Sequence, residues 1–198
     1  SQEAHDAILE FVRSTKMNTA AIEALVYCLS RTRNVSVISS LKQLLTPEES
    51  VSTHWIATQV LGERRESSVL QSLLRLLDET EEWVVQQSCL IALGRLGDAS
   101  IIPVLDQYGD IPHLAEHWAT ALLLLGDDIA VHQLAGQLSE GKLGQQSILG
   151  HVVGRYGGTT NLLLLKRLGN SELPVNLSAI HGLGYLGDTR ALPILLEM

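Results

Sequence analysis

The sequence predicts an all-α fold, a right-handed α-solenoid of about six helix pairs that forms a single domain over residues 1–198. Three observations predict this class. A short sequence pattern recurs along the chain, and the intervals between its copies fit two short antiparallel helices with their turns. In addition, no segment shows the sustained alternation of polar and apolar residues that is typical of a strand.

The recurring pattern is clearest in two places. Residues 92–98 read Ala-Leu-Gly-Arg-Leu-Gly-Asp, and residues 182–188 read Gly-Leu-Gly-Tyr-Leu-Gly-Asp. Weaker copies with the same apolar run lie before and between them. One residue of each copy serves as an anchor, and the anchors are 29 to 35 residues apart: Ser30, Gly62, Gly97, Gly126, Gly157 and Gly187.

The residue types in the pattern have defined places at helix boundaries. Glycine just past a helix end adopts a left-handed backbone conformation at little cost, which we expect of Gly97 and Gly187. The aspartates that follow, Asp98 and Asp188, are expected to cap the next helix. Pro103 then falls early in that helix, where a missing N–H group costs least.

The elements follow in order from these boundaries. A helix near residues 3–13 opens the chain. The inner helix of each pair precedes its anchor, with predicted ranges 18–30, 47–61, 81–96, 112–125, 142–156 and 172–186. The outer helices fill the gaps, at 34–45, 67–78, 99–107, 128–138, 158–168 and 189–198. For the second inner helix, Thr46 as cap, Pro47 at the first position and Glu49 three residues after the cap form a complete start signal.

The composition argues against several classes of protein. The chain has 14 Lys and Arg and 22 Asp and Glu, a formal charge of −8 that disfavours nucleic acid as a partner. No segment reaches the ~18 continuous apolar residues of a membrane span, and the first residues do not resemble a signal peptide. The two cysteines, Cys28 and Cys89, lie far apart in helical patterns, which predicts buried free thiols and a reducing cytosol.

The pattern Ala-Leu-Gly-x-Leu-Gly-Asp, followed by Pro-x-Leu, resembles the HEAT-like repeats named after phycobilisome lyases. Size, acidic balance and loosened repeats make the chain similar to the smaller, F-type subunit of the E/F-type phycocyanobilin lyases. The resemblance implies a lyase subunit that works as a heterodimer with a related HEAT-repeat subunit, in the cyanobacterial cytosol or plastid stroma. It also implies that the pair binds the bilin phycocyanobilin as substrate, with no permanently bound cofactor, and attaches it by a thioether bond to a cysteine of the phycocyanin α-subunit.

The same repeats also occur in scaffolds, in a metal-dependent protein hydroxylase and in DNA-repair glycosylases. A non-catalytic scaffold or chaperone in phycobilisome assembly or degradation therefore stays open as the alternative. The chain departs from the usual repeat at Gln86, which stands after Val85 where an arginine is usual. The side-chain contacts between successive repeats are therefore left open.

One stripe of each inner helix is expected to face the concave groove of the solenoid. Residues two, six and nine positions before the anchor share this stripe, because they lie close together around the helix. In the N-terminal repeats the stripe is apolar, and exposed apolar surface usually marks a partner contact. We expect the partner subunit to contact Ala21, Ala24, Ile56, Val60 and Ile91.

In the C-terminal repeats the stripe becomes polar. His151 and Arg155 are four residues apart on one helix, and His181 and Tyr185 repeat that spacing on the next. Such a patch, about 10 Å across, suits a flat anionic ligand, although it also fits a simple solvated face. Arginine forks onto a propionate, histidine donates a proton and tyrosine stacks. We expect His181 and His151 to be catalytic, and we expect the ligand to contact Arg155, Tyr185, Arg95, His117 and Thr120.

A metal site is not expected. His113, Glu116 and His117 share one helix, but no further ligand with comparable spacing is adjacent in the sequence. The three tryptophans, Trp55, Trp83 and Trp118, are interpreted as core or edge packing.

Overall fold

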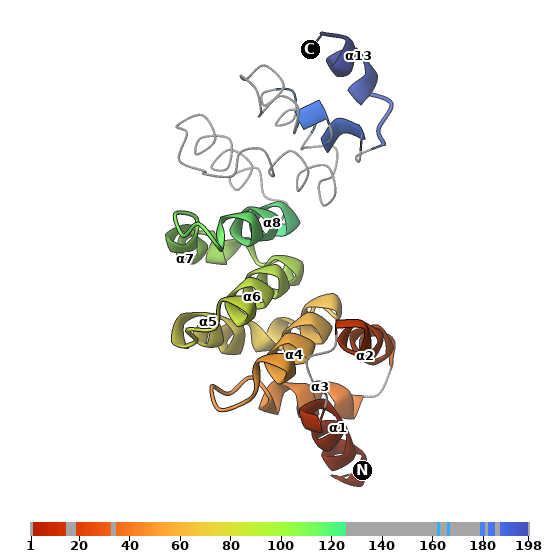
Figure 1. Cartoon of the computed structure of the whole chain (residues 1–198), viewed down its shortest axis with the longest axis vertical. Helices are drawn as coiled ribbons and strands as arrows, with labels where there is room; N and C mark the ends of the chain where they lie inside the picture. The colour runs from red at the N-terminus through yellow and green to blue at the C-terminus, as the bar shows by residue number, and fades with distance from the viewer. Residues whose placement is uncertain are drawn as a thin grey trace. The chain divides into compact units, whose positions relative to one another are not determined.

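The computed structural model describes residues 2–14, 19–32, 35–125, 162, 166, 179–180, 182–184 and 187–197. Within these ranges every regular element is helical and none is a strand, which confirms the all-α solenoid class (Figure 1). The α-helices are α1 Gln2–Ser14, α2 Thr19–Arg31, α3 Val35–Gln43, α4 Val51–Glu63, α5 Leu70–Glu79, α6 Trp83–Leu96, α7 Ile102–Leu105, α8 Ala115–Leu125 and α13 Ala191–Glu197. Three short 3-10 helices accompany them: η1 Ser67–Val69, η2 Ala99–Ile101 and η3 Asp106–Tyr108.

Most predicted helices within these ranges are confirmed to within a few residues. The predicted outer helix 99–107 is a succession of η2, α7 and η3 instead of one continuous helix. The predicted helices 128–138 and 142–156 lie outside the described residues, and those at 158–168 and 172–186 are described only in part. The number of helix pairs and the handedness of the solenoid stay predictions.

The chain divides into two compact units, Ser1–Leu96 and Gly97–Met198. In the first unit α4 packs against α2 on one side and α6 on the other, so these inner helices form one layer (Figure 1). Helix α1 packs against α3, and α5 packs against α6. Stacked helix pairs of this kind define a solenoid. The prediction of a single domain concerns the relation between the two units and stays a prediction.

The core of the first unit lies where α4 meets α6. Val60, Leu61 and Leu93 are fully buried there, as the apolar stripe of an inner helix requires. A polar contact crosses the same interface, because the hydroxyl of Thr58 donates to Oγ of Ser88 at 3.0 Å. Both hydroxyls also lie within hydrogen-bond distance of carbonyls of their own helices, Thr58 of His54 at 2.8 Å and Ser88 of Val85 at 2.9 Å, so neither is left unsatisfied in the core.

In the second unit α8 carries the expected buried stripe. Trp118, Ala121 and Leu122 are fully buried, and Leu125 is nearly so. Gly109 lies under the indole of Trp118, and a Cβ on it would come within 3.0 Å of the ring. Trp118 is therefore confirmed as a core residue.

The predicted helix boundaries are confirmed at both strong copies of the pattern. Gly97 and Gly187 have φ angles of +79° and +61°, in the left-handed region. Asp98 accepts a hydrogen bond from the backbone N–H of Ser100 at 3.1 Å, and Asp188 accepts one from that of Arg190 at 2.9 Å. These side chains accept hydrogen bonds from N–H groups at the start of the following helix, which would otherwise lack a partner within the helix.

The predicted start of the second inner helix at Thr46 is wrong. Helix α4 begins at Val51, and Ser50 caps it by accepting a hydrogen bond from the N–H of Thr53 at 3.2 Å. Nε2 of His54 lies 2.6 Å from the carbonyl of Thr46, which holds Thr46 in the preceding turn. A later cap and a tertiary contact therefore override the local signal.

A third residue with positive φ corrects the alignment of the repeats. Arg65 has φ +51°, and it follows Gly62 by three residues, as Gly97 follows Gly94. Gly62 is therefore equivalent to Gly94, and not to Gly97 as the anchors assumed. Ser30, Gly62 and Gly94 are evenly spaced, 32 residues apart. A shift of three residues turns a stripe by about 60° around the helix.

This correction overturns part of the expected partner surface. Ile56 and Val60, expected in the groove, are fully buried in the core, because the shifted stripe of α4 faces its neighbours. Cys28, expected to be buried, is exposed, whereas Cys89 is buried as expected.

Candidate functional site

With the alignment corrected, three equivalent positions of α2, α4 and α6 carry side chains that are not buried. They recur at intervals of four residues along each helix and so share one face. We call these residues the inner-face ladder: Glu23, Tyr27 and Arg31 of α2, Trp55, Gln59 and Glu63 of α4, and Gln87, Ile91 and Arg95 of α6.

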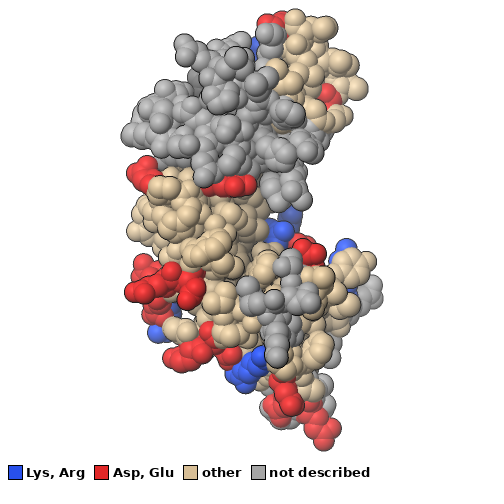
Figure 2. All heavy atoms as spheres, viewed as in Figure 1, with Lys and Arg blue, Asp and Glu red and all other residues tan. Residues whose placement is uncertain are grey.

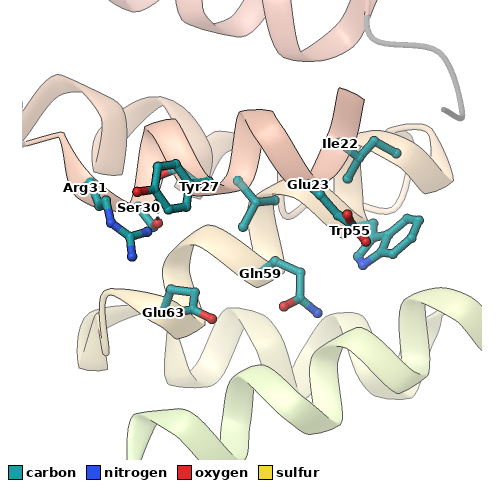
Figure 3. A pocket seen from close by; sticks show the side chains of 9 residues that line it. Ile22, Glu23, Tyr27, Ser30, Arg31, Trp55, Gln59 and Glu63 are labelled. Atoms are coloured by element: carbon teal, nitrogen blue, oxygen red, sulfur yellow. Dashed lines mark hydrogen bonds between the residues drawn. The ribbon is translucent and has the colours of Figure 1, made fainter. Parts of the chain in front are cut away.

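A cavity of about 410 Å³ opens between α2 and α4 on this face (Figure 3). The ladder residues of both helices line it, together with Ile22, Val26 and Ser30. Its volume falls in the range of about 300–1,000 Å³ that is usual for small-molecule sites. Figure 3 shows aromatic, amide and charged side chains directed toward the same space from the two helices.

At one end of the cavity a cation stacks on an aromatic ring. The guanidinium carbon of Arg31 lies 3.8 Å from the ring centroid of Tyr27, one turn earlier on the same helix. This distance is that of a cation–π contact. Tyr27 is 59% exposed, so its ring forms part of the open rim.

Along the α4 side, two cavity residues hold a second cation. Nη1 of Arg95, on α6, donates to Oε1 of Gln59 at 2.8 Å, and Nη2 lies 3.0 Å from Oε1 of Glu63. The pair is partly exposed, so its contribution to stability is modest, at most about 1 kcal/mol. Arg95 was expected to contact a ligand, and the structure places it at the margin of the cavity, where it neutralises Glu63.

The remaining carboxylate of the cavity has no such partner. The carboxylate of Glu23 makes no hydrogen bond or ion pair with any residue that the structure describes. It lies near Trp55, at the end of the cavity away from Tyr27 and Arg31 (Figure 3). The indole of Trp55 is half-buried, so one part of it faces the cavity.

Two of the predicted ligand contacts lie on α8, in the second unit. Thr120 is buried, and its hydroxyl donates to the carbonyl of Glu116 at 2.8 Å. His117 is half-buried, and burial lowers its pKa, against the opposing effect of Glu116. Its Nδ1 has no hydrogen-bond partner among the described residues. Any role of these residues in binding stays a prediction.

The other four predicted site residues, His151, Arg155, His181 and Tyr185, lie outside the described residues. The polar patch that they were expected to form therefore stays a prediction as well.

The described residues offer binding groups and no activated nucleophile. Burial raises the pKa of the Cys89 thiol, which keeps it protonated and unreactive. Across the described ranges, no group of three or more His, Cys, Asp or Glu residues is placed to hold a metal ion. In the same ranges, no helix combines the length and the apolar character needed to cross a bilayer.

Sequence reasoning gave no binding role to the cavity residues. The sequence feature that could have identified them is the match of Leu61-Gly62-Glu63 to Leu93-Gly94-Arg95. This match is lost when Gly62 is aligned with Gly97. Aligned in this way, Arg31, Glu63 and Arg95 become equivalent, and the charged ladder is visible in the sequence itself.

Comparison with known proteins supports the repeats. The family model for HEAT repeats matches residues 38–123, which confirms HEAT repeats in that part of the chain. No curated protein matches the chain significantly. Human deoxyhypusine hydroxylase, solved in complex with glycerol, is 17% identical with a TM-score of 0.47, over 98% of this chain and 89% of that one. A likeness at that level carries no argument about activity or partners.

Proposed function

We propose that the chain is the binding subunit of a heterodimeric bilin lyase. With a related HEAT-repeat subunit, it would hold phycocyanobilin and help attach it to a cysteine of the phycocyanin α-subunit, in a cyanobacterial cytosol or plastid stroma. The observation that supports a binding role is the cavity on the inner face of α2 and α4, where aromatic and charged side chains converge. The resemblance of the repeat pattern to the E/F-type lyases supports the finer assignment.

The reaction depends mainly on positioning the bilin and the thiol, and less on an activated catalytic group. A cysteine thiolate of the acceptor protein adds to a vinylic carbon of the bilin, a carbon–sulfur bond forms, and a proton is taken up by the bilin. No oxidant or reductant is needed, because the step is a net addition of a thiol to a double bond. Holding bilin and thiol together and supplying the proton account for most of the rate. In this proposal His151 and His181 supply the proton, while Arg155 and Tyr185 hold the bilin.

The first test is optical. Phycocyanobilin is mixed with the chain alone and with the chain plus its related HEAT-repeat subunit, and the absorbance is recorded. Binding in a fixed shape is expected to shift and sharpen the band. Arg155→Ala is expected to weaken binding by about 1.5–3 kcal/mol if its charged hydrogen bond is shielded from water. Arg75→Ala, on the outer helix α5, is the control and leaves the spectrum unchanged.

A second candidate function has its own support. Phe11, Tyr27 and Trp83 are large and apolar, yet 60%, 59% and 54% exposed. Exposed aromatic side chains are typical of protein-binding surfaces. They favour a non-catalytic scaffold or chaperone in phycobilisome assembly or degradation. The absorbance test separates the two functions, because a scaffold leaves the bilin spectrum unchanged with or without the related subunit.

A further inference from the structure

We propose that the cavity between α2 and α4 is a docking pocket for one arginine side chain of a protein partner, held between the indole of Trp55 and the carboxylate of Glu23. This inference deepens the proposed function, since it names the chemistry of a protein contact. It rests on that function only in requiring a protein partner, and it does not depend on the bilin.

The first argument comes from the chain's own guanidinium groups on this face. Arg31 is held by the ring of Tyr27 at 3.8 Å, and Arg95 is held by Gln59 and Glu63. Each of these cations therefore has either an aromatic face or a carboxylate as its partner. The inner-face ladder is thus built from groups that bind guanidinium.

The Trp55–Glu23 end offers both kinds of partner at once. Indole is the strongest cation–π acceptor among the side chains, and a carboxylate accepts two parallel hydrogen bonds from a guanidinium. Among the described residues, no Lys or Arg side chain pairs with the carboxylate of Glu23, so this end of the cavity has no cation of the chain's described part bound to it. A planar guanidinium can stack on Trp55 and fork onto Glu23, whereas the ammonium of lysine can only act as a point charge.

The charges around the cavity favour a single positive group. The lining contains Glu23, Glu63 and Arg31, and Arg95 neutralises Glu63 from outside the lining. A carboxylate placed at the Trp55 end would be repelled by Glu23, whereas Arg31 lies at the other end of the cavity. The chain's charge of −8 also attracts a basic segment over distance. On the face shown in Figure 2, acidic surface is more extensive than basic surface over the described residues.

The surroundings of the cavity indicate a protein segment rather than a small free cation. Ala20 and Ala24 are exposed and lie three residues before Glu23 and Tyr27 on α2, so they flank the cavity residues, and the ring of Tyr27 forms the rim. A polypeptide that places its arginine in the cavity can therefore contact an adjacent apolar surface made of small side chains. Such an arrangement, with an arginine at the centre and apolar contacts around it, is common in protein interfaces.

The test uses the full chain and the peptide acetyl-Gly-Arg-Gly-amide, with the citrulline peptide as its neutral match. Indole ¹⁵N–¹H signals are followed by NMR, and Trp55→Phe identifies the signal of Trp55. The arginine peptide is expected to move the Trp55 signal, but not those of Trp83 and Trp118, within about 20 mM. The citrulline peptide is expected to bind about two- to fivefold more weakly, because it lacks the charge.

Glu23→Gln keeps the size of the side chain and removes its charge. We expect it to weaken binding of the arginine peptide about two- to fivefold, with an unchanged circular dichroism spectrum. Glu81→Gln, at another exposed site in the same unit, is the control and leaves binding unchanged. A Trp55 signal that does not move, or equal binding of both peptides or of Glu23→Gln, would overturn the proposal. If Glu23→Gln instead abolishes the bilin-dependent absorbance while no peptide binds, the cavity belongs to the bilin, and only the docking proposal fails.

Discussion

Gly62 of α4 lies directly against the backbone of Ala92 in α6, and a Cβ on Gly62 would come within 2.8 Å of the Cα of Ala92. Real Cβ atoms essentially never come so close. The two inner helices therefore reach their observed distance only because position 62 has no side chain. This contact connects two successive repeats and holds the ladder residues Gln59 and Glu63 opposite Arg95.

The first prediction concerns this contact. Gly62→Ala is expected to lower the free energy of unfolding by about 1–3 kcal/mol, because α4 and α6 must move apart. Thermal unfolding followed by circular dichroism measures the change. Gly184→Ala is the matched control, since a Cβ at that helical position meets nothing within 4 Å. We expect the control to be neutral or slightly stabilising. Equal stability of the two variants would show that the close approach is not required.

The second prediction concerns Arg65. Its φ angle of +51° is one that residues with a Cβ adopt only with strain. Arg65→Gly is therefore expected to raise the free energy of unfolding by about 0.5–1 kcal/mol, whereas Gly97→Ala is expected to lower it by about 1 kcal/mol. The opposite signs of the two changes, measured in urea, test the equivalence of the two positions. A destabilised Arg65→Gly variant would contradict it.

The third prediction concerns pH. Burial lowers the pKa of His117 in the folded chain, so the unfolded chain binds this proton more readily. The group has no effect on stability above its ordinary pKa, where both states are neutral, and it destabilises the fold as the pH falls below that value. Between pH 7 and 5, the free energy of unfolding is expected to fall less steeply for the His117→Gln variant than for the wild-type chain. His113→Gln, at an exposed position on the same segment, is the control. An unchanged pH profile for His117→Gln would show that this imidazole is charged as easily in the folded chain.

Helix boundaries were predictable where one residue type satisfied one backbone requirement. Gly97, Asp98 and Pro103 stand where the left-handed turn, the cap and the first helical turn need them, so the sequence indicates them directly. Arg65 performs the turn without being a glycine, and no local signal marks it. The alignment of the first two repeats was therefore missed by three residues, and with it the identity of the inner face.

The candidate site depended on that alignment. The half-buried position of Trp55 follows from how α2 packs on α4, which no local pattern reveals, and so does the carboxylate of Glu23, which has no partner among the described residues. Side chains such as Ile56 are apolar in either alignment, so composition cannot tell a buried stripe from an exposed partner surface. Tertiary packing decides between them, and it places Ile56 in the core.

The most direct measurement of the central claim is the yield of pigmented phycocyanin α-subunit in cells. The acceptor, the bilin pathway and the related HEAT-repeat subunit are expressed with this chain, without it, or with its Arg155→Ala, His181→Gln double variant, and bilin fluorescence on the acceptor is read. The account predicts full yield only with the wild-type chain and a large loss with the folded double variant. Equal yield in the absence of this chain would contradict its role as a lyase subunit.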